Sequence, residues 1–394
     1  MSKSITRAST DLRRLQDEGY DLEICRGFLL VHQIPYVTPA KEVAYGTLVS
    51  TLELAGEVTT APQQHEMHFV GETPCDAEGV PLSAVINQSQ RHELAPGLSV
   101  DHFLSSKPAA TGRYSDYYEK VSTYATILVT PARRLDPGAT PLSHPLITED
   151  EDGDPVFNYT ETASSRADIV TITEKLRIGP VAIVGLGGTG AYVLDFLAKT
   201  PVREIHIFDA DLFAQHNAFR APGAASREEL KVKPQKVDYL KARYEPMRRG
   251  IIAHDCFVDE SNVDQLAEMD FVFLALDESE PKRAIVEFLE RMGKGFIDAG
   301  MGLEALDGSL RGQIQTTTST PAVRDHFRRR VSLADPNLAD DYDQNIQIAE
   351  LNALNAALAV IRFKKLYGFY ADDEGEHTSV YVLEGNRLLN EDCS

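Results

Sequence analysis

The stretch Val181-Ala-Ile-Val-Gly-Leu-Gly-Gly-Thr-Gly190 decides the fold class of this chain. Its four leading apolar residues predict a short strand that is buried on both faces. A helix is expected at Ala191–Lys199, after a turn that contains four glycines, Gly185, Gly187, Gly188 and Gly190. Glycine here permits a tight turn, a close approach of backbone amides to a phosphate, and close packing of the helix. A strand, a glycine turn and a helix in this order predict an anion-binding site at the helix N-terminus.

Strands and helices alternate along the chain from Thr160 onward. The further segments expected to form strands are Glu204–Phe208, Ile251–His254, Phe271–Leu276 and Gly295–Ile297. Helices are expected between them, at Lys231–Arg243, Val263–Met269 and Pro281–Met292. This alternation is typical of a parallel sheet whose crossover helices cover both faces. We therefore predict an α/β domain over residues 160–394, with a Rossmann-like, mostly parallel sheet and helices on both faces.

The N-terminal third has a different pattern. A short charged helix is expected near Leu12–Glu18, and runs of β-branched and aromatic residues follow at Phe28–Val31, Thr47–Leu54, Met67–Val70 and Tyr124–Val129. These features predict a small α+β domain over residues 1–135. Residues 136–159 combine several prolines with the acidic run Glu149–Asp154, which is too polar to pack against a core. A solvated linker is expected there.

Charge and cysteine content exclude several classes of protein. The formal net charge of −21 disfavours nucleic-acid binding, which depends on Lys and Arg neutralising phosphates. The four cysteines form no Cys-x-x-Cys pair, so we expect neither a structural zinc site nor a disulfide framework. No apolar run approaches the roughly 20 residues of a membrane helix, and Met1–Arg14 lacks the pattern of a secretory signal. The expectation is a cytoplasmic protein that binds neither nucleic acid nor a membrane.

The glycine turn by itself fits two kinds of nucleotide site. Gly185, Gly187 and Gly190 satisfy the dinucleotide pattern G-x-G-x-x-G, and Asp209 follows the next strand, where it can accept hydrogen bonds from a ribose. An NAD(P)-binding oxidoreductase is therefore one interpretation of this segment.

The residues after Asp209 favour transfer of a nucleotidyl group instead. Asp211, Asn217 and Arg220 follow, and then comes the segment Lys233-Pro-Gln-Lys236. A hydride-transfer site has no need of cations at this place. Arg and Lys beside Mg²⁺ are the groups that stabilise charge on an α-phosphate and on departing pyrophosphate.

The order of these residues resembles that of the ThiF/MoeB and ubiquitin-activating-enzyme superfamily. Its members carry G-x-G-G-x-G, then D-x-D, N-x-x-R, a Lys that opens a helix, and an Asp after the next buried strand. The matching residues here are Gly185–Gly190, Asp209, Asp211, Asn217, Arg220, Lys236 (with Lys233 as the alternative) and Asp277. Phe296–Met301 and Ile346–Leu366 resemble the family's strand beside the substrate tail and its late core helix. The usual Thr-Asp-Asn is replaced by Leu276-Asp277-Glu278, so one polar contact is lost.

The resemblance implies an ATP- and Mg²⁺-dependent adenylyltransferase. The C-terminal glycine of a ubiquitin-like, β-grasp protein would attack the α-phosphorus of ATP, giving an acyl-adenylate and pyrophosphate. By the same resemblance, Arg220 and Lys236 stabilise the phosphates, Asp209 binds the ribose, and Asp277 holds Mg²⁺. Arg166 would reach the ATP of a second subunit, which implies a homodimer.

The catalytic cysteine of ubiquitin-type activators has no counterpart after the Gly302–Gly312 region. Three interpretations stay open. The adenylate passes directly to a partner such as a conjugating enzyme, or a distant thiol (Cys75 or Cys393 before Cys256) is recruited. Alternatively a hydroxyl accepts the acyl group as an ester, with His326 as the nearest base and with the candidates Thr316, Thr317, Thr318, Ser319 and Thr320. This run is also typical of a plain β-strand.

The N-terminal domain resembles a domain fused to ThiF-type enzymes in bacterial operons for ubiquitin-like conjugation. We expect it to recruit a protein partner, either the carrier or a conjugating enzyme. A scaffold that binds nucleotide without chemistry is the remaining alternative, although the complete set of charged site residues disfavours it.

Overall fold

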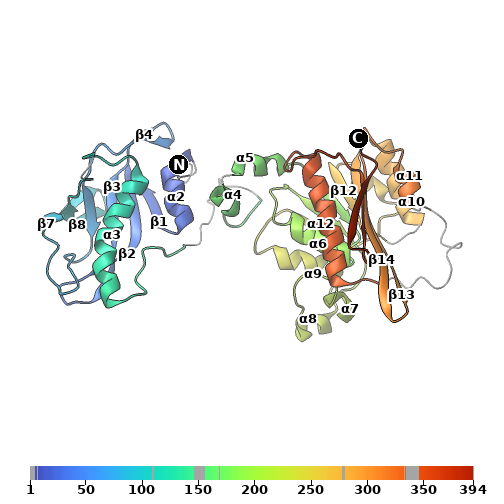
Figure 1. Cartoon of the computed structure of the whole chain (residues 1–394), viewed down its shortest axis with the longest axis horizontal. Helices are drawn as coiled ribbons and strands as arrows, with labels where there is room; N and C mark the ends of the chain where they lie inside the picture. Colours follow the sequence, from blue (N-terminus) through green and yellow to red (C-terminus); the bar gives the residue numbers. More distant parts are fainter. Residues whose placement is uncertain are drawn as a thin grey trace. The chain divides into compact units, whose positions relative to one another are not determined.

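The computed structural model describes residues 5–6, 8–108, 111–145, 156–167, 169–276, 280–331, 333 and 346–393. They form two compact units, drawn with their elements in Figure 1. Unit 1 comprises residues 1–147 and 162–168, and unit 2 comprises residues 148–161 and 169–394. Residues 146–155 of the expected linker lie outside the described residues. Val156 and Phe157, at the end of that linker, are buried, and Phe157 forms a β-bridge with Arg248 of unit 2.

An antiparallel sheet of six strands, in the order β1-β2-β3-β6-β8-β7, forms the centre of unit 1. The strands are β1 (Asp21–Cys25), β2 (Phe28–Val37), β3 (Val43–Thr51), β6 (Met67–Val70), β7 (Ile86–Ala95) and β8 (Leu98–Leu104), and β4 (Leu54–Ala55) pairs separately with β5 (Val58–Thr59). Helices α2 (Thr10–Glu18) and α3 (Tyr117–Leu135) share one buried cluster with Leu29, Leu48 and Phe69 of the sheet. The short helix α4 (Ala163–Arg166) also belongs to this unit.

The run Tyr124–Val129, which we expected to be a strand, lies inside helix α3. Its aromatic and β-branched residues suit a strand, but its buried positions follow helical spacing through Tyr117, Val121, Tyr124 and Leu128. Asp116 caps the helix by accepting the Glu119 N–H at 2.8 Å. Burial of one helical face against the sheet therefore outweighs local β propensity.

An eight-stranded sheet forms the centre of unit 2, in the order β11-β10-β9-β12-β13-β14-β15-β16. The strands are β9 (Val181–Val184), β10 (Ile205–Phe208), β11 (Ile251–His254), β12 (Phe271–Leu274), β13 (Gly295–Leu306), β14 (Ser309–Ser319), β15 (Thr378–Val382) and β16 (Arg387–Glu391). The pairs from β11 to β13 are parallel, and those from β13 to β16 are antiparallel. The predicted Rossmann-like, mostly parallel sheet is confirmed for the segment that contains the glycine turn.

Helices cover both faces of this parallel part, as predicted. Val181 and Ile183 share a buried cluster with residues of α6 (Gly188–Leu197), α9 (Lys236–Tyr244) and α12 (Ala349–Leu366). Ala182 and Val184 point to the opposite cluster, which contains residues of η2 (Val263–Leu266), α10 (Glu280–Arg291) and α11 (Phe327–Arg330). Alternate residues of β9 thus enter two cores, which explains its continuous apolar sequence. The short α5 (Val170–Thr173) and η1 (Glu174–Leu176) precede this strand.

The segment expected as one helix at Lys231–Arg243 is interrupted. It consists of the end of α8 (Arg227–Val232) and the start of α9, with Lys233 between them in the left-handed region at φ 50°. Pro234 follows directly, and proline disfavours helical backbone in the residue before it. The break makes Lys236 the first residue of α9. The remaining short helix, α7 (Gln215–Ala218), precedes Arg220.

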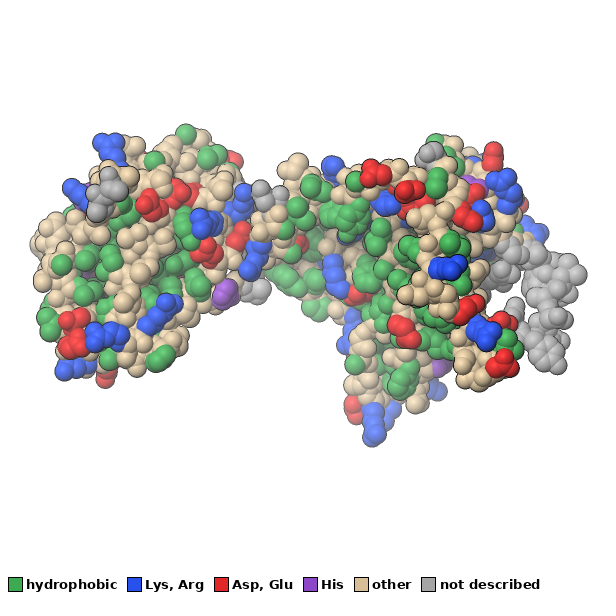
Figure 2. Space-filling model, in the orientation of Figure 1, with side chains coloured by type: hydrophobic (Ala, Val, Ile, Leu, Met, Phe, Trp, Pro, Cys, Tyr) green, Lys and Arg blue, Asp and Glu red, His purple; other side chains and the backbone are tan. Residues whose placement is uncertain are grey.

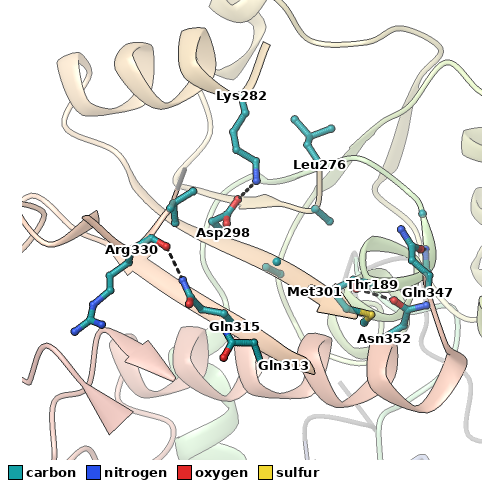
Figure 3. A pocket seen from close by; sticks show the side chains of 17 residues that line it. Thr189, Leu276, Lys282, Asp298, Met301, Gln313, Gln315, Arg330, Gln347 and Asn352 are labelled. Carbon is teal, nitrogen blue, oxygen red and sulfur yellow. Dashed lines mark hydrogen bonds and ion pairs between the residues drawn. The ribbon is translucent and has the colours of Figure 1, made fainter. Parts of the chain in front are cut away.

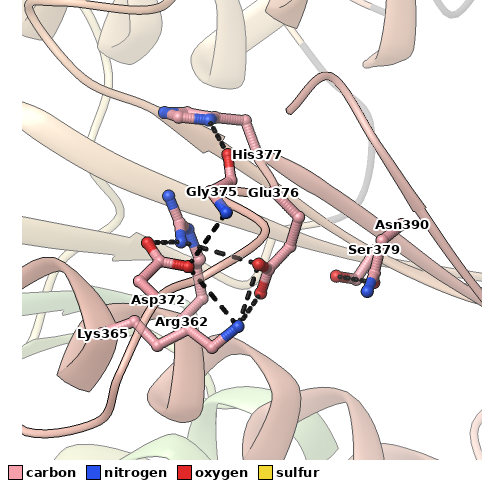
Figure 4. Close-up of polar contacts among 8 residues, drawn as sticks. All are labelled: Arg362, Lys365, Asp372, Gly375, Glu376, His377, Ser379 and Asn390. Atoms are coloured by element: carbon pink, nitrogen blue, oxygen red, sulfur yellow. Dashed lines mark hydrogen bonds and ion pairs between the residues drawn. The ribbon is translucent and has the colours of Figure 1, made fainter. Parts of the chain in front are cut away.

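Helix α12 contacts both helix α6 and the β13 and β14 strands of unit 2. One face of α12 is buried against α6, Leu354 and Leu358 pack half-buried against the cluster of Leu303 and Ile314, and Ile361 is exposed. Figure 2 shows hydrophobic side chains gathered over this helix. At its C-terminal end, Lys365 Nζ binds Glu376 at 2.7 Å and Arg362 binds Asp372, which ties the loop before β15 to the helix (Figure 4). Within the described part of the chain, no helix combines the length and apolar content needed to cross a membrane.

Candidate active site

Two glycines of the turn between β9 and α6 stand where no side chain fits. Gly185 has φ 90°, and a Cβ there would lie 2.5 Å from the Ala275 carbonyl oxygen. A Cβ on Gly190 would lie 1.9 Å from the Gly185 carbonyl oxygen. The backbone of the turn therefore meets the first turn of α6 directly. The N-terminus of this ten-residue helix offers amides and a favourable field to an anion.

An acid and a lysine lie beside this turn. Asp209 follows β10 and is buried, and its Oδ2 accepts the Leu186 N–H at 2.7 Å. Lys236 Nζ lies 3.3 Å from Asp209 Oδ2 and 2.7 Å from Asp211 Oδ2. The ammonium is nearly inaccessible, whereas the Asp211 side chain is more than half exposed. The two carboxylates hold the lysine ammonium in position beside the turn.

Arg220 lies just after the short helix α7. The buried Asn217 accepts the Ala214 N–H at 2.8 Å through its side chain, which shapes α7, and its carbonyl accepts the Arg220 N–H. The Nε of Arg220 is buried and has no hydrogen-bond partner among the described residues. Burying an arginine donor without a partner costs free energy, so this group is expected to meet an anionic ligand.

The side chains of Asn352, in α12, and Gln347, just before it, contact the glycine turn, and Asn352 also contacts the backbone of Arg220. Asn352 has no exposed surface; its Nδ2 donates to the Arg220 carbonyl at 3.3 Å, and its Oδ1 accepts the Thr189 hydroxyl at 3.0 Å. Gln347 Oε1 accepts the Gly188 N–H at 3.3 Å. A Cβ on Gly188 would lie 1.8 Å from Asn352 Nδ2. The third glycine of the turn is therefore required by a tertiary contact of α12.

A cavity of about 320 Å³ opens between the glycine turn and the β13–β14 hairpin (Figure 3). Polar side chains dominate its wall, among them Lys282, Asp298, Gln313, Gln315, Gln347 and Asn352. Gly300 and Gly302 of β13 stand opposite Gln315 and Gln313 of β14. A wall of amides and bare glycine backbone suits an extended polypeptide, whose own amides need hydrogen-bond partners.

The structure describes some of the other predicted site residues and omits one. Asp277 lies outside the described residues, and Arg166 is the last residue of α4 in unit 1. Thr316, Thr317 and Thr318 lie in β14 and are all buried, with Thr317 opposite Asp298. His326 is also buried, and its Nε2 lies 2.9 Å from the Thr318 carbonyl, so that nitrogen donates its proton. These hydroxyls are reachable only if the strand or its cover moves.

Two of the thiols considered as acyl acceptors lie in surroundings that suppress their reactivity. Cys75 is buried, and burial raises the pKa of its thiol, as does the nearby Asp76 carboxylate. Burial likewise raises the pKa of Cys256, beside Asp255 and Asp259. A raised pKa reduces the fraction of thiolate, which is the nucleophilic form. Cys393 is exposed and is the remaining candidate of this kind.

Sequence reasoning missed Lys282, Asn352 and Gln347 as members of the site. Lys282 lies in an amphipathic helix, where a lysine ordinarily points to solvent. Asn352 offered a weak signal, because an amide in the middle of an otherwise apolar helix requires a partner when it is buried. Nothing local in the sequence identifies that partner as Thr189.

Two family models and several known proteins match parts of this chain. The model of the ThiF family matches residues 163–380, and a model described as a domain of unknown function (DUF6791) matches residues 10–162. Ubiquitin-like modifier-activating enzyme 5 of Drosophila virilis is 25% identical over 160 residues, which cover 38% of this chain and 40% of that protein. The enzyme of the same name from Xenopus laevis is 25% identical over 162 residues, with the same coverage. The chain thus spans about 40% of the length of these relatives.

Solved structures of similar proteins include E. coli MccB bound to succinimide and PaaA. The MccB structure has a TM-score of 0.48 and 16% identity, and the match covers 59% of this chain and 72% of MccB. The PaaA structure has a TM-score of 0.43 and 17% identity, with coverage of 56% and 75%.

Proposed function

The chain belongs to the ThiF family, and from this premise we propose that it is an ATP-dependent adenylyltransferase acting on the C-terminal glycine of a ubiquitin-like, β-grasp protein. A carboxylate oxygen of that glycine attacks the α-phosphorus of ATP. The new O–P bond replaces the bond to pyrophosphate, which leaves with the electron pair. The attacking group is already deprotonated, so the step needs positioning and charge stabilisation rather than a general base.

The observation that supports this proposal best is the Nε of Arg220, which is buried and has no hydrogen-bond partner among the described residues. A hydride-transfer site gains nothing from a buried cation there, whereas charge on the departing pyrophosphate is stabilised by one. Lys236 supplies a second cation and Asp209 a ribose-binding carboxylate, while the first amides of α6 hold phosphate oxygens. Asp211 and Asn217 complete the nucleotide site. The residues thus fit ATP in charge and in hydrogen-bonding capacity.

Mg²⁺ accompanies ATP in this proposal, and Asp277 is its protein ligand. The ion would neutralise the phosphate oxygens and support departure of pyrophosphate. Among the described residues, no group of three or more His, Cys, Asp or Glu side chains is arranged to hold a metal. A single carboxylate combined with the phosphates of the nucleotide is a usual Mg²⁺ site.

We propose direct transfer of the adenylate to a partner, such as a conjugating enzyme recruited by the N-terminal unit. The burial of Thr316, Thr317 and Thr318 disfavours an ester on these hydroxyls, which remain the second option. Arg166 is proposed to contact the ATP of a second subunit in a homodimer. Mixing Arg166→Ala with Arg220→Ala protein tests this role, because activity should return only if each variant supplies the arginine that the other lacks.

The experiment that tests the main proposal is ATP–pyrophosphate exchange with ubiquitin-like proteins encoded by neighbouring genes. Wild-type protein should exchange only when a carrier with a free C-terminal glycine is present. Arg220→Ala should reduce the exchange rate by about 100-fold or more, because a transition-state charge contact is lost. Arg227→Ala, an exposed arginine of α8, is the control and should leave the rate unchanged.

Two results would contradict the adenylation proposal. If NAD(P) binds and Arg220→Ala leaves its affinity intact, the chain is an oxidoreductase on the same fold. If ATP binds but no carrier supports exchange, the chain is a nucleotide-binding scaffold.

A further inference from the structure

One buried ion pair in the cavity wall has no role in the nucleotide site. Lys282, near the start of α10, and Asp298, in β13, lie 2.8 Å apart between Nζ and Oδ1. Their side chains are 4% and 6% exposed. Both line the cavity that also contains Gly187, Gly188 and Thr189 of the glycine turn (Figure 3). The pair therefore lies where a second substrate would meet a nucleotide bound at the turn.

Lys282 offsets the negative charge of Asp298 in the cavity wall. A substrate carboxylate bound in this cavity would enter a protein of net charge −21 and would lie near the Asp298 carboxylate. Without Lys282, two anions would face each other in a poorly solvated cavity, which is strongly unfavourable. With Lys282, the ion pair has no net charge before the substrate arrives. The substrate carboxylate then shares one cation with Asp298.

Two other cations near the cavity, Arg330 and Lys236, are already engaged by carboxylates. Arg330 lines it too, but its Nε binds Asp392 at 2.8 Å and its Nη1 binds Glu391. Lys236 is held by Asp209 and Asp211. Lys282 has a single carboxylate partner among the described residues. Because an ammonium carries three donors, it can keep Asp298 and still donate to a second carboxylate.

We propose that Lys282 binds the substrate carboxylate and orients it toward the nucleotide at the glycine turn, while Asp298 holds the ammonium in place. This inference rests on the proposed adenylation. The contact is made to the reacting group itself, so Lys282 acts as a substrate-binding residue of the active site and Asp298 as a positioning residue. A hydrogen bond between charged groups in a buried site is short and strong, so it fixes the direction of the attacking oxygen.

The test compares two adenosine-containing probes, of which only one carries an acyl group at the position of the substrate carboxylate. One is AMP, which occupies only the nucleotide site. The other is adenosine joined through a sulfamate to glycylglycine, whose acyl oxygen stands for one oxygen of the substrate carboxylate. Calorimetric titration of both probes separates the nucleotide contacts from the contact made by Lys282.

Lys282→Met should weaken binding of the glycylglycyl sulfamate by about 10-fold or more and leave AMP affinity within about twofold. Lys282→Arg keeps the cation and should recover part of the lost affinity. The matched control is Arg291→Met, at the exposed end of the same helix, which should change neither affinity. The double variant Lys282→Met with Asp298→Asn leaves no lone buried charge. It should fold at least as well as Lys282→Met and lose the same selective affinity.

Three other results would contradict the proposed role of Lys282, and each can be told from the others by the affinities of the two probes. Equal losses for both probes would mean that the pair only maintains the fold. Unchanged affinity for the sulfamate in Lys282→Met, or a wild-type protein that binds the sulfamate no better than AMP, would overturn the carboxylate contact and leave the nucleotide site intact. A wild-type protein that binds neither AMP nor ATP would refute the proposed adenylation itself.

Discussion

Lys120 shows at the residue scale how burial changes an ionisable group in this protein. It lies on α3 with no exposed surface, and its Nζ donates to the Ser50 hydroxyl at 2.8 Å. Burial lowers the pKa of this lysine from 10.5 to about 8, and the carboxylates of Glu66 and Glu53 oppose the shift. The charged form is thus less stable in the folded protein than in the unfolded chain. Folding of unit 1 carries this cost at neutral pH.

Replacing Lys120 by Met should stabilise unit 1 at pH 7 by about 1–3 kcal/mol, since the cost of burying the charge disappears. Between pH 8 and 10.5 the unfolded chain binds more protons than the folded protein at this position. The free energy of unfolding of the wild type therefore rises with pH across this window, and its deficit relative to the variant shrinks.

Urea denaturation of both proteins at pH 7 and pH 10 measures that difference. Lys41→Met, at an exposed position of unit 1, is the control and should show no pH-dependent effect. A difference between wild type and Lys120→Met that grows from pH 7 to pH 10 would contradict the assignment of the lowered pKa.

Helix α12 connects the two halves of the site at the scale of an element. Asn352 and Asn355 are three residues apart, so both face the same side of the helix, and neither has exposed surface. Asn352 contacts Thr189 and the Arg220 carbonyl, on the side of the nucleotide turn. Asn355 Nδ2 donates to the Gly300 carbonyl at 2.9 Å, on the wall of the β13 strand.

We expect the two asparagines to affect different substrates. Asn352→Ala should raise the KM for ATP by about 3- to 10-fold, because the turn loses a buried hydrogen bond worth about 0.5–1.5 kcal/mol. Asn355→Ala should instead raise the KM for the carboxylate substrate and leave that for ATP almost unchanged. Steady-state pyrophosphate release with each substrate varied in turn distinguishes the two, and the variants serve as controls for each other. If both variants raised the two KM values equally, α12 would have only a general role in stability.

The two compact units of the molecule have separate hydrophobic cores. The buried cluster around Leu29 and Tyr117 belongs to unit 1, and the clusters around Ile183 and Val184 belong to unit 2. Each unit has enough residues to bury a core of its own.

Thermal unfolding of the full chain is therefore expected to show two cooperative transitions. Lys120→Met should raise the transition of unit 1 alone. Leu194→Ala truncates a fully buried side chain of α6 and should reduce the unfolding free energy of unit 2 by about 2–5 kcal/mol. The midpoint temperature of the unit 2 transition should fall accordingly. Differential scanning calorimetry of the two variants provides the measurement. A single transition that both substitutions move would show that the units unfold together.

Local chemistry in the sequence predicted much of this architecture. The glycine turn, the buried strand before it and the helix after it follow from backbone rules that act over a few residues. The strand expected at Tyr124–Val129 was wrong, because its helical burial pattern depends on a sheet made by residues far away in the chain. The continuous helix expected at Lys231–Arg243 was also wrong, although Pro234 carried the signal for the break.

Sequence alone determined the family resemblance, the parallel sheet and the candidate nucleotide residues. Buried strands, glycine turns and the order of charged residues each depend on residues that are close together in the sequence. Only the tertiary structure decided which charges meet. Lys236 binds Asp209 and Asp211, Lys282 binds Asp298, and Asn352 reaches Thr189 because sheet order and helix packing bring distant segments within hydrogen-bond distance. Such contacts depend on three-dimensional neighbours that no local pattern encodes, and they are the ones on which the proposed chemistry depends.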